Sequence, residues 1–267
     1  MAQKIFQVDA FTAEPFKGNP AGVCLLNEDA DEKWMQAVAR EMNVAETAFL
    51  VRDEKSADSF HLRWFTPTVE VDLCGHATLA SAHLIWEEGA AQRDSPLSFQ
   101  TRSGVLTARS AGDWIELDFP AEPPAEQSAY PLELRDGLRI EPRYVGQNRL
   151  DFLVEVENEK AVRRLEPDLR LLRSLRARGV IVTSRADDKR YDFVSRFFAP
   201  GAGVDEDPVT GSAHCCLGPF WSERLGLDEM LGYQASSRGG EVRVRVDGER
   251  VQLGGQAVTT LRGEIMF

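Results

Sequence analysis

The chain has 267 residues, with 43% hydrophobic and 28% charged content, which is typical of a globular protein and excludes an intrinsically disordered one. Its formal net charge of -12 at pH 7 argues against nucleic acid as a partner, because phosphate binding needs a basic surface. There is no apolar run of the ~18 residues that a membrane span needs, so no membrane association is expected.

The chain reads directly into a strand without an apolar leader, so we expect a cytoplasmic protein. Its cysteines, at positions 24, 74, 215 and 216, form no C-x-x-C pair, and reduced cytosolic thiols fit this pattern best. An acidic protein can still bind an anion, because helix N-termini supply positive potential through their backbone N–H groups.

In the first half of the chain, residues 4–11 alternate as a half-buried strand, and we expect a turn at residues 18–20. Apolar residues at helical spacing predict a helix over 31–42 that stops at Asn43. An apolar strand follows over 47–51, which puts Glu46 at the lip of that strand.

A second strand is predicted over residues 60–67, followed by a loop and a helix that begins at Gly75 and stops near Gly89. The second half repeats this plan, with a strand over 191–200 and a helix that begins at Gly211. Both strands end in Arg, two aromatic residues, a variable residue and Pro. We interpret this as an internal duplication, with chance similarity as the alternative.

The most proline-rich stretch, residues 119–128, is a candidate linker. We therefore predict an N-terminal domain over 1–119 and a C-terminal domain over 120–256, with a last strand at about 257–267 that packs back on the first domain. A hairpin is expected where residues 242–246 and 250–253 flank Asp-Gly-Glu. The predicted fold class is α/β with much antiparallel strand.

The helix starts at Gly75 and Gly211–Ser212 are candidate anion sites, because first-turn N–H groups lack helical partners and glycine permits close approach. If the halves face each other across a cleft, these amides converge on a carboxylate. The alternative is that both glycines are ordinary turn residues before a helix.

Two carboxylates are candidates for proton transfer. Glu46 lies among apolar residues, where partial screening from water would strengthen its affinity for a proton, as a general base near neutral pH requires. Asp207 precedes Pro208 in a polar, glycine-rich loop. The alternative for Glu46 is a side chain that simply faces solvent. The alternative for Asp207 is a helix cap or a solvated charge in a loop.

His76 directly follows Gly75 at a helix start, where the helix dipole disfavours imidazolium and a neutral ring is expected. His83 and His214 are predicted core residues, and His61 is expected to face outward. A metal site from Cys74, His76, His214 and Cys215 is disfavoured, because neighbouring positions on a helix point about 100° apart. The chain also lacks a Walker loop and a G-x-G-x-x-G after a strand, which argues against nucleotide cofactors. It has no serine elbow either.

Four motifs in order and spacing resemble the PhzF-like family over essentially the whole chain. They are the segments at 9–11 with 18–20, at 43–49, at 75–78 and at 207–214.

The resemblance implies the diaminopimelate-epimerase fold, in which two similar domains each wrap a curved sheet around a helix and the active site lies between them. It also implies a homodimer, no cofactor and a small carboxylate-bearing substrate. Glu46 would then be the general acid/base. The remaining site residues that the resemblance implies are His76 and Asp207, with Gly75, Gly211, Ser212 and Asn19 near the substrate carboxylate.

The chain departs from related enzymes at two places. Ala45 stands where the phenazine enzyme has a serine, which weakens a claim to the phenazine substrate. Cys74 matches the first cysteine of two-thiol racemases and epimerases, but Pro208 occupies the second position, which disfavours a two-cysteine mechanism.

We therefore expect a cofactor-independent isomerase in which Glu46 removes a proton next to an unsaturated or carboxylate system and returns it elsewhere. One alternative is an amino-acid racemase or epimerase with Glu46 and Asp207 as opposed bases. Another is a non-catalytic protein that binds metabolites.

Overall fold

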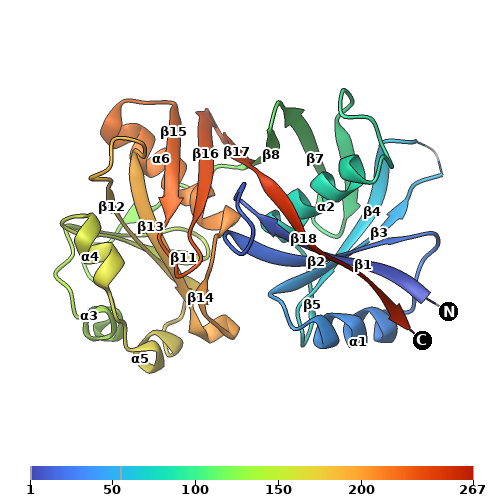
Figure 1. Ribbon diagram of the computed structural model, residues 1–267. Helices are drawn as coiled ribbons and strands as arrows, with labels where there is room; N and C mark the ends of the chain where they lie inside the picture. The colour runs from blue at the N-terminus through green and yellow to red at the C-terminus, as the bar shows by residue number, and fades with distance from the viewer. Residues whose placement is uncertain (1, 55, 267) are drawn as a thin grey trace. The chain divides into compact units, whose positions relative to one another are not determined.

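The computed structural model describes residues 2–54 and 56–266, and none of the helices there is long and apolar enough to cross a membrane. The chain divides into two compact units, labelled by element in Figure 1. Unit 1 consists of Met1–Asp118 with Gly254–Phe267, and unit 2 consists of Phe119–Leu253.

The elements along the first half alternate between strands and two main helices. In chain order they are β1 (Ala2–Ala10), β2 (Asn19–Leu26), α1 (Glu32–Met42), β3 (Glu46–Arg52), β4 (Ser59–Phe65), β5 (Glu70–Val71), α2 (Gly75–Glu87), β6 (Leu97–Thr101), β7 (Gly104–Ala111) and β8 (Trp114–Pro120).

The second half has the same character, with three short helices before a long one. In chain order its elements are β9 (Ala125–Glu126), α3 (Leu132–Leu138), β10 (Tyr144–Gln147), β11 (Asp151–Glu155), α4 (Glu159–Arg164), α5 (Leu169–Arg173), β12 (Gly179–Arg185), β13 (Phe193–Ala199), η1 (Pro200–Ala202), β14 (Val204–Asp207), α6 (Gly211–Leu225), β15 (Glu229–Gln234), β16 (Gly240–Asp247), β17 (Arg250–Gly255) and β18 (Ala257–Met266).

Strand pairing shows the same topology in both units. In unit 1, β1 pairs antiparallel with β2, and β3 pairs antiparallel with β4. Between them, β2 and β3 pair in parallel, and α1 forms the crossover that connects them. In unit 2, β10, β11, β12 and β13 pair in the same sequence, with α4 and α5 as the crossover. Each unit continues through a short strand, a long helix and a parallel strand, β6 on β4 and β15 on β13. The predicted duplication and α/β class are confirmed.

The repeated arginine of the two strand ends has the same role in each unit. The Nε and Nη2 atoms of Arg63 on β4 each lie 2.7 Å from a carboxylate oxygen of Glu70 on β5. The corresponding atoms of Arg196 on β13 lie 2.7 and 2.9 Å from Glu206 on β14. Such bidentate pairs fix geometry as well as contributing energy. They hold the short strand that leads into each long helix.

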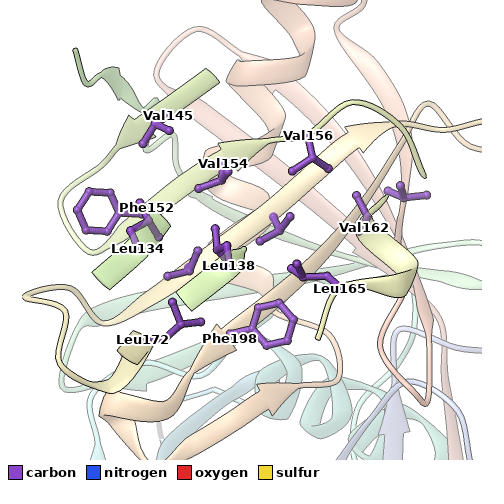
Figure 2. Packing of buried hydrophobic residues seen from close by; sticks show 13 residues of the cluster. Leu134, Leu138, Val145, Phe152, Val154, Val156, Val162, Leu165, Leu172 and Phe198 are labelled. Carbon is purple, nitrogen blue, oxygen red and sulfur yellow. The ribbon is translucent and has the colours of Figure 1, made fainter. Parts of the chain in front are cut away.

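The long helices α2 and α6 lie inside their units. Ten of the thirteen residues of α2 are buried, including all of His76–Ala82. This exceeds the single apolar stripe that the sequence predicts, because the sheet wraps around the helix and leaves it almost no solvent face. A further core in unit 2 packs α3 to α5 on the sheet, with Leu138, Phe152, Val154, Leu172 and Phe198 among its members (Figure 2).

Helix α1 begins and ends where its sequence predicts. The carboxylate of Asp31 accepts a hydrogen bond from the Lys33 backbone N–H at 2.9 Å, which caps the start of the helix. Asn43 ends it in a left-handed conformation, with φ of 50°.

The predicted turn at residues 18–20 is wrong in part. Gly18 makes the turn, with φ of 61°, but Asn19 and Pro20 already belong to β2. Asn19 pairs with Ala10 of β1 and is fully buried. Proline is tolerated at the start of a strand, so Pro20 does not break it.

The last strand returns to the first. β18 pairs antiparallel with β1 from Ala2 opposite Met266 to Ala10 opposite Ala257, with one irregularity after Gln7. The chain therefore completes the sheet of unit 1 with residues more than 240 positions away from β1.

Candidate active site

Glu46 is the first residue of β3, at the edge where two parallel strands begin. It lies opposite Ala21 of the neighbouring strand β2. Asn19 stands two residues before Ala21, so strand alternation places both side chains on the same face of the sheet. The sheet thus brings the predicted residues Asn19 and Glu46 to one edge of unit 1.

The start of helix α2 brings a second predicted residue to Glu46. The His76 Nε2 atom lies 3.2 Å from Oε2 of Glu46, and the two side chains are only 7% and 19% exposed. On the other side of the ring, Nδ1 of His76 lies 3.5 Å from Sγ of Cys74. Glu46, Cys74 and His76 therefore form one partly enclosed polar cluster.

The imidazole of His76 is neutral at ordinary pH. Burial lowers the pKa of His76 from 6.5 to about 3, because a charged ring would lose its hydration. The expectation of a neutral ring holds, and burial is a cause that the sequence did not show. A neutral ring can donate one hydrogen bond and accept another, so it can orient the Glu46 carboxylate without forming an ion pair.

Both long helices begin at the predicted glycine without a side-chain cap. The residue before Gly75 is Cys74 and the residue before Gly211 is Thr210. In neither case does this residue's side chain accept a hydrogen bond from the helix. First-turn N–H groups have no partner within a helix, so both starts keep the character of an anion site.

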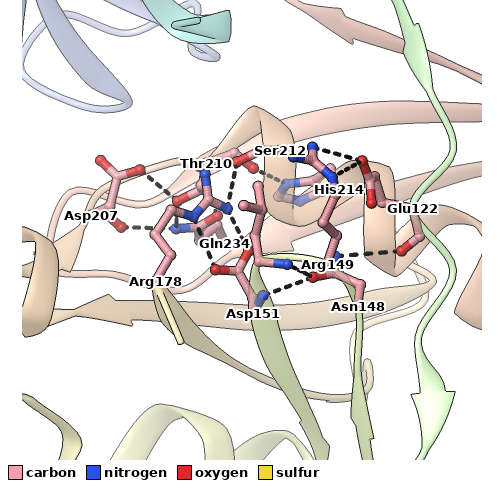
Figure 3. A network of polar contacts seen from close by, with 11 residues as sticks. Glu122, Asn148, Arg149, Asp151, Arg178, Asp207, Thr210, Ser212, His214 and Gln234 are labelled. Atoms are coloured by element: carbon pink, nitrogen blue, oxygen red, sulfur yellow. Dashed lines mark hydrogen bonds and ion pairs between the residues drawn. The ribbon is translucent and has the colours of Figure 1, made fainter. Parts of the chain in front are cut away.

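In unit 2, Asp207 is held at the end of β14 by the loop that enters α6. Its Oδ2 accepts a hydrogen bond from the Thr210 hydroxyl at 2.5 Å. The fully buried Gln234 donates to the Asp207 carbonyl at 2.8 Å and accepts from the Thr210 N–H at 2.9 Å. Figure 3 shows this network, which fixes Asp207 beside the helix start.

The sequence reasoning missed a cation beside Ser212. Arg178 forms a bidentate pair with Asp151, which is fully buried, and its Nη2 also donates to Ser212 Oγ at 2.9 Å (Figure 3). Its side chain is 32% exposed. No motif marks Arg178, and only its position just before the apolar run at 180–182 could have suggested it.

Because the two units share a topology, the position of Arg178 in unit 2 can be compared with that of Glu46 in unit 1. In unit 1 the start of β3 meets the start of α2 through the Glu46–His76 contact. In unit 2 the start of β12 meets the start of α6 through the Arg178–Ser212 contact. The same junction therefore carries a carboxylate in one unit and a guanidinium in the other.

The four residues of the disfavoured metal set do not share one unit. Cys74 and His76 lie in unit 1, whereas His214 and Cys215 lie on α6 of unit 2. His214 is a fully buried core residue, as predicted, and donates through Nδ1 to the Thr210 carbonyl at 2.8 Å. His83 is only partly buried and contacts Thr259 Oγ1 at 3.2 Å. His61 is exposed, as predicted.

Comparison with known families decides the relationship. The PhzC-PhzF family model, described as phenazine biosynthesis-like protein, matches residues 8–263. The chain belongs to this phenazine biosynthesis-like family. A protein of Halalkalibacterium halodurans named as an uncharacterized isomerase is 54% identical over 267 residues, covering 100% of both chains.

Solved structures agree. A PhzF family protein from Enterococcus faecalis has a TM-score of 0.94 and 39% identity, with 100% of each chain covered. A hydroxyproline epimerase from Agrobacterium vitis shares the fold, with a TM-score of 0.64 and 11% identity, and covers 99% of this chain and 92% of that one. The predicted family resemblance and the epimerase-like fold are both confirmed.

Proposed function

We propose that this phenazine biosynthesis-like protein is an isomerase that needs no cofactor and moves a proton on a small carboxylate-bearing metabolite. Glu46 takes the proton from carbon and returns it. The observation that carries the proposal is the contact between the half-screened Glu46 carboxylate and the neutral ring of His76, 3.2 Å apart.

A carboxylate held in this way is suited to proton transfer. Partial removal from water strengthens a carboxylate as a base, and a positioned general base contributes about 10²–10⁴-fold in rate. The His76 ring lies beside one carboxylate oxygen, Oε2, and restricts the space open to it. Its neutrality matters, because an imidazolium at this place would weaken the carboxylate as a base.

The carbanion that forms needs stabilisation, which the helix starts can supply. The N-termini at Gly75 and Gly211 have no side-chain cap, and a helix N-terminus favours negative charge. A donor that acts like one of an oxyanion hole contributes roughly 10²–10³ in rate.

In this proposal the substrate carboxylate binds in unit 2. Arg178 and Ser212 together offer a guanidinium and a hydroxyl next to the Gly211 helix start. Guanidinium groups suit carboxylates because their N–H groups match both oxygens. The family resemblance implies that Glu46 and Ser212 act on one substrate, and the proposal adds Arg178 to that arrangement.

Asp207 gives a second candidate reaction. Its carboxylate is fixed by Thr210 and Gln234, as a second base for racemisation or epimerisation would have to be. In that reaction Glu46 and Asp207 would act from opposite sides of one carbon. The first reaction, a 1,3-shift that returns the proton to a different atom of the substrate, is preferred because it needs only one base, and the contact with His76 marks Glu46 as that base.

The test is a screen of small unsaturated and amino carboxylates in D₂O, followed by NMR. Deuterium that enters at a position other than the one deprotonated indicates the 1,3-shift, and exchange at a single α-carbon indicates racemisation. Glu46→Gln should abolish the exchange, whereas Glu41→Gln, at an exposed position on α1, should not change it. Full exchange in Glu46→Gln would reject the assigned role, and exchange of no carboxylate by the wild type would favour a binding protein.

A further inference from the structure

Three side chains of unit 1 have the composition and spacing of a metal site. Glu46, Cys74 and His76 each offer one ligand atom, and these atoms lie within 4.8 Å of one another. Carboxylate, thiolate and imidazole are all ligands of Zn²⁺ in proteins. The cluster comes from the start of β3 and the start of α2, two well-fixed elements.

We propose that Glu46, Cys74 and His76 bind a borderline-soft divalent cation such as Zn²⁺, and that its binding reversibly inhibits the enzyme. Binding depends only on the cluster. Inhibition rests on the proposed function, because it requires Glu46 to be the base.

The distances are close to those of a tetrahedral site. Zn–S bonds of about 2.3 Å and Zn–N or Zn–O bonds of about 2.0–2.1 Å put neighbouring ligand atoms roughly 3.3–3.6 Å apart. The Cys74 Sγ to His76 Nδ1 distance is 3.5 Å, and the His76 Nε2 to Glu46 Oε2 distance is 3.2 Å. These contacts use opposite nitrogens of the ring, and one ion can bind only one of them. The ligand atoms of the cluster lie within 4.8 Å of one another, so one ligand must move by about 1 Å to reach a zinc-site spacing, which a side-chain rotation provides.

The charges of the cluster also favour a dication. A thiolate and a carboxylate together neutralise the charge of Zn²⁺, and the cation itself deprotonates a coordinating thiol. The third ligand must be an unprotonated imidazole, and the buried ring of His76 can supply one. The positive end of α2 opposes the cation, but it acts with about half a charge against two full negative charges.

The choice of metal follows from the ligands. Sulfur and nitrogen donors favour Zn²⁺ over Mg²⁺ and Ca²⁺, which prefer oxygen. Three protein ligands leave the fourth position to water, as in catalytic zinc sites. With one oxygen of Glu46 bound to the cation, the adjacent positive charge makes that carboxylate a much weaker base towards the substrate.

The experiment measures metal binding first and activity second. Full-length protein is titrated with Zn²⁺ against a chromophoric chelator, and with Co²⁺ to detect a thiolate-to-metal charge-transfer band. Variants are Cys74→Ser, Cys74→Ala and Glu46→Gln, with Cys215→Ser as the matched control on a buried cysteine of unit 2. Near-ultraviolet circular dichroism confirms that each variant is folded.

We expect one Zn²⁺ per chain, a Co²⁺–thiolate band that both Cys74 variants lose, and no effect of Cys215→Ser. Changes in the groups that support a zinc ligand already cost 10–100-fold in affinity, so loss of a ligand should cost at least about 100-fold. Unchanged binding in the Cys74 variants, or loss of binding in Cys215→Ser, would overturn the site. Zn²⁺ that binds as expected but leaves turnover unchanged would uphold the metal site and reject Glu46 as the base.

Discussion

Acid should destabilise unit 2 through His214, a fully buried imidazole on α6. Its Nδ1–H donates to the Thr210 carbonyl at 2.8 Å, and its Nε2 has no hydrogen-bond partner within residues 2–54 and 56–266. The ring packs beside Phe193, with centroids 5.9 Å apart. A second proton would therefore place an unsatisfied N–H and a charge in the core.

Burial lowers the pKa of His214 from 6.5 to about 4, although the Thr210 hydrogen bond acts in the opposite direction. The unfolded chain thus binds this proton first as the pH falls. The stabilisation by the neutral ring is complete above about pH 6.5 and is lost as the pH falls towards 4. A pH of about 5 lies roughly 1.5 units below the pKa of the imidazole in the unfolded chain. The free energy of unfolding therefore falls by about 2 kcal/mol.

The assay is urea unfolding at a series of pH values between about 8 and about 5, for the wild type and for His214→Gln. The variant is expected to be less stable at every pH, but its stability should fall by about 2 kcal/mol less over this range than that of the wild type. His61→Gln, at an exposed site on β4, serves as control and should follow the wild type. Equal losses in wild type and His214→Gln would refute the reasoning.

Two further predictions concern stability and substrate binding. Gly89→Ala should cost about 1 kcal/mol for its left-handed backbone alone, since nothing lies within 4 Å of the new Cβ. Gly18→Ala should lower the free energy of unfolding by about 2–4 kcal/mol, because its Cβ would stand 2.1 Å from the Ala10 carbonyl oxygen. Equal shifts of the melting temperature in Gly18→Ala and Gly89→Ala would contradict this. Arg178→Gln should destabilise the protein by about 3–5 kcal/mol by leaving the buried Asp151 unpaired. Adding Asp151→Asn should restore stability but not carboxylate affinity, and recovery of both would show that Arg178 does not bind substrate.

Local chemistry made several elements predictable. The ends of α1 follow from Asp31 and Asn43, and the starts of α2 and α6 from Gly75 and Gly211. Each of these signals acts over one helical turn, so the sequence carries it directly.

Strand β2 was missed for a physical reason. Its sequence begins Asn-Pro-Ala-Gly and does not alternate, because six of its eight residues are buried. A strand covered on both faces loses the two-residue period that sequence reasoning relies on, and proline with glycine imitates a turn.

The contacts of the candidate site depend on register and topology. Glu46 meets His76 only because β3 and α2 begin at the same edge of the sheet. Arg178 meets Asp151 because β11 and β12 run parallel in the register that places Asp151 opposite Gly179. No motif encodes either distance. Glu46 and His76 were candidates from their local sequence and from the family resemblance, whereas Arg178 emerged only from the structure.

The role of Glu46 is tested most directly by measuring ligand affinity and proton exchange together in Glu46→Gln, with one carboxylate that the wild type turns over. The account predicts a dissociation constant within a few-fold of the wild-type value and exchange slowed by at least about 10²-fold. Exchange at the wild-type rate by a variant that binds normally would contradict it.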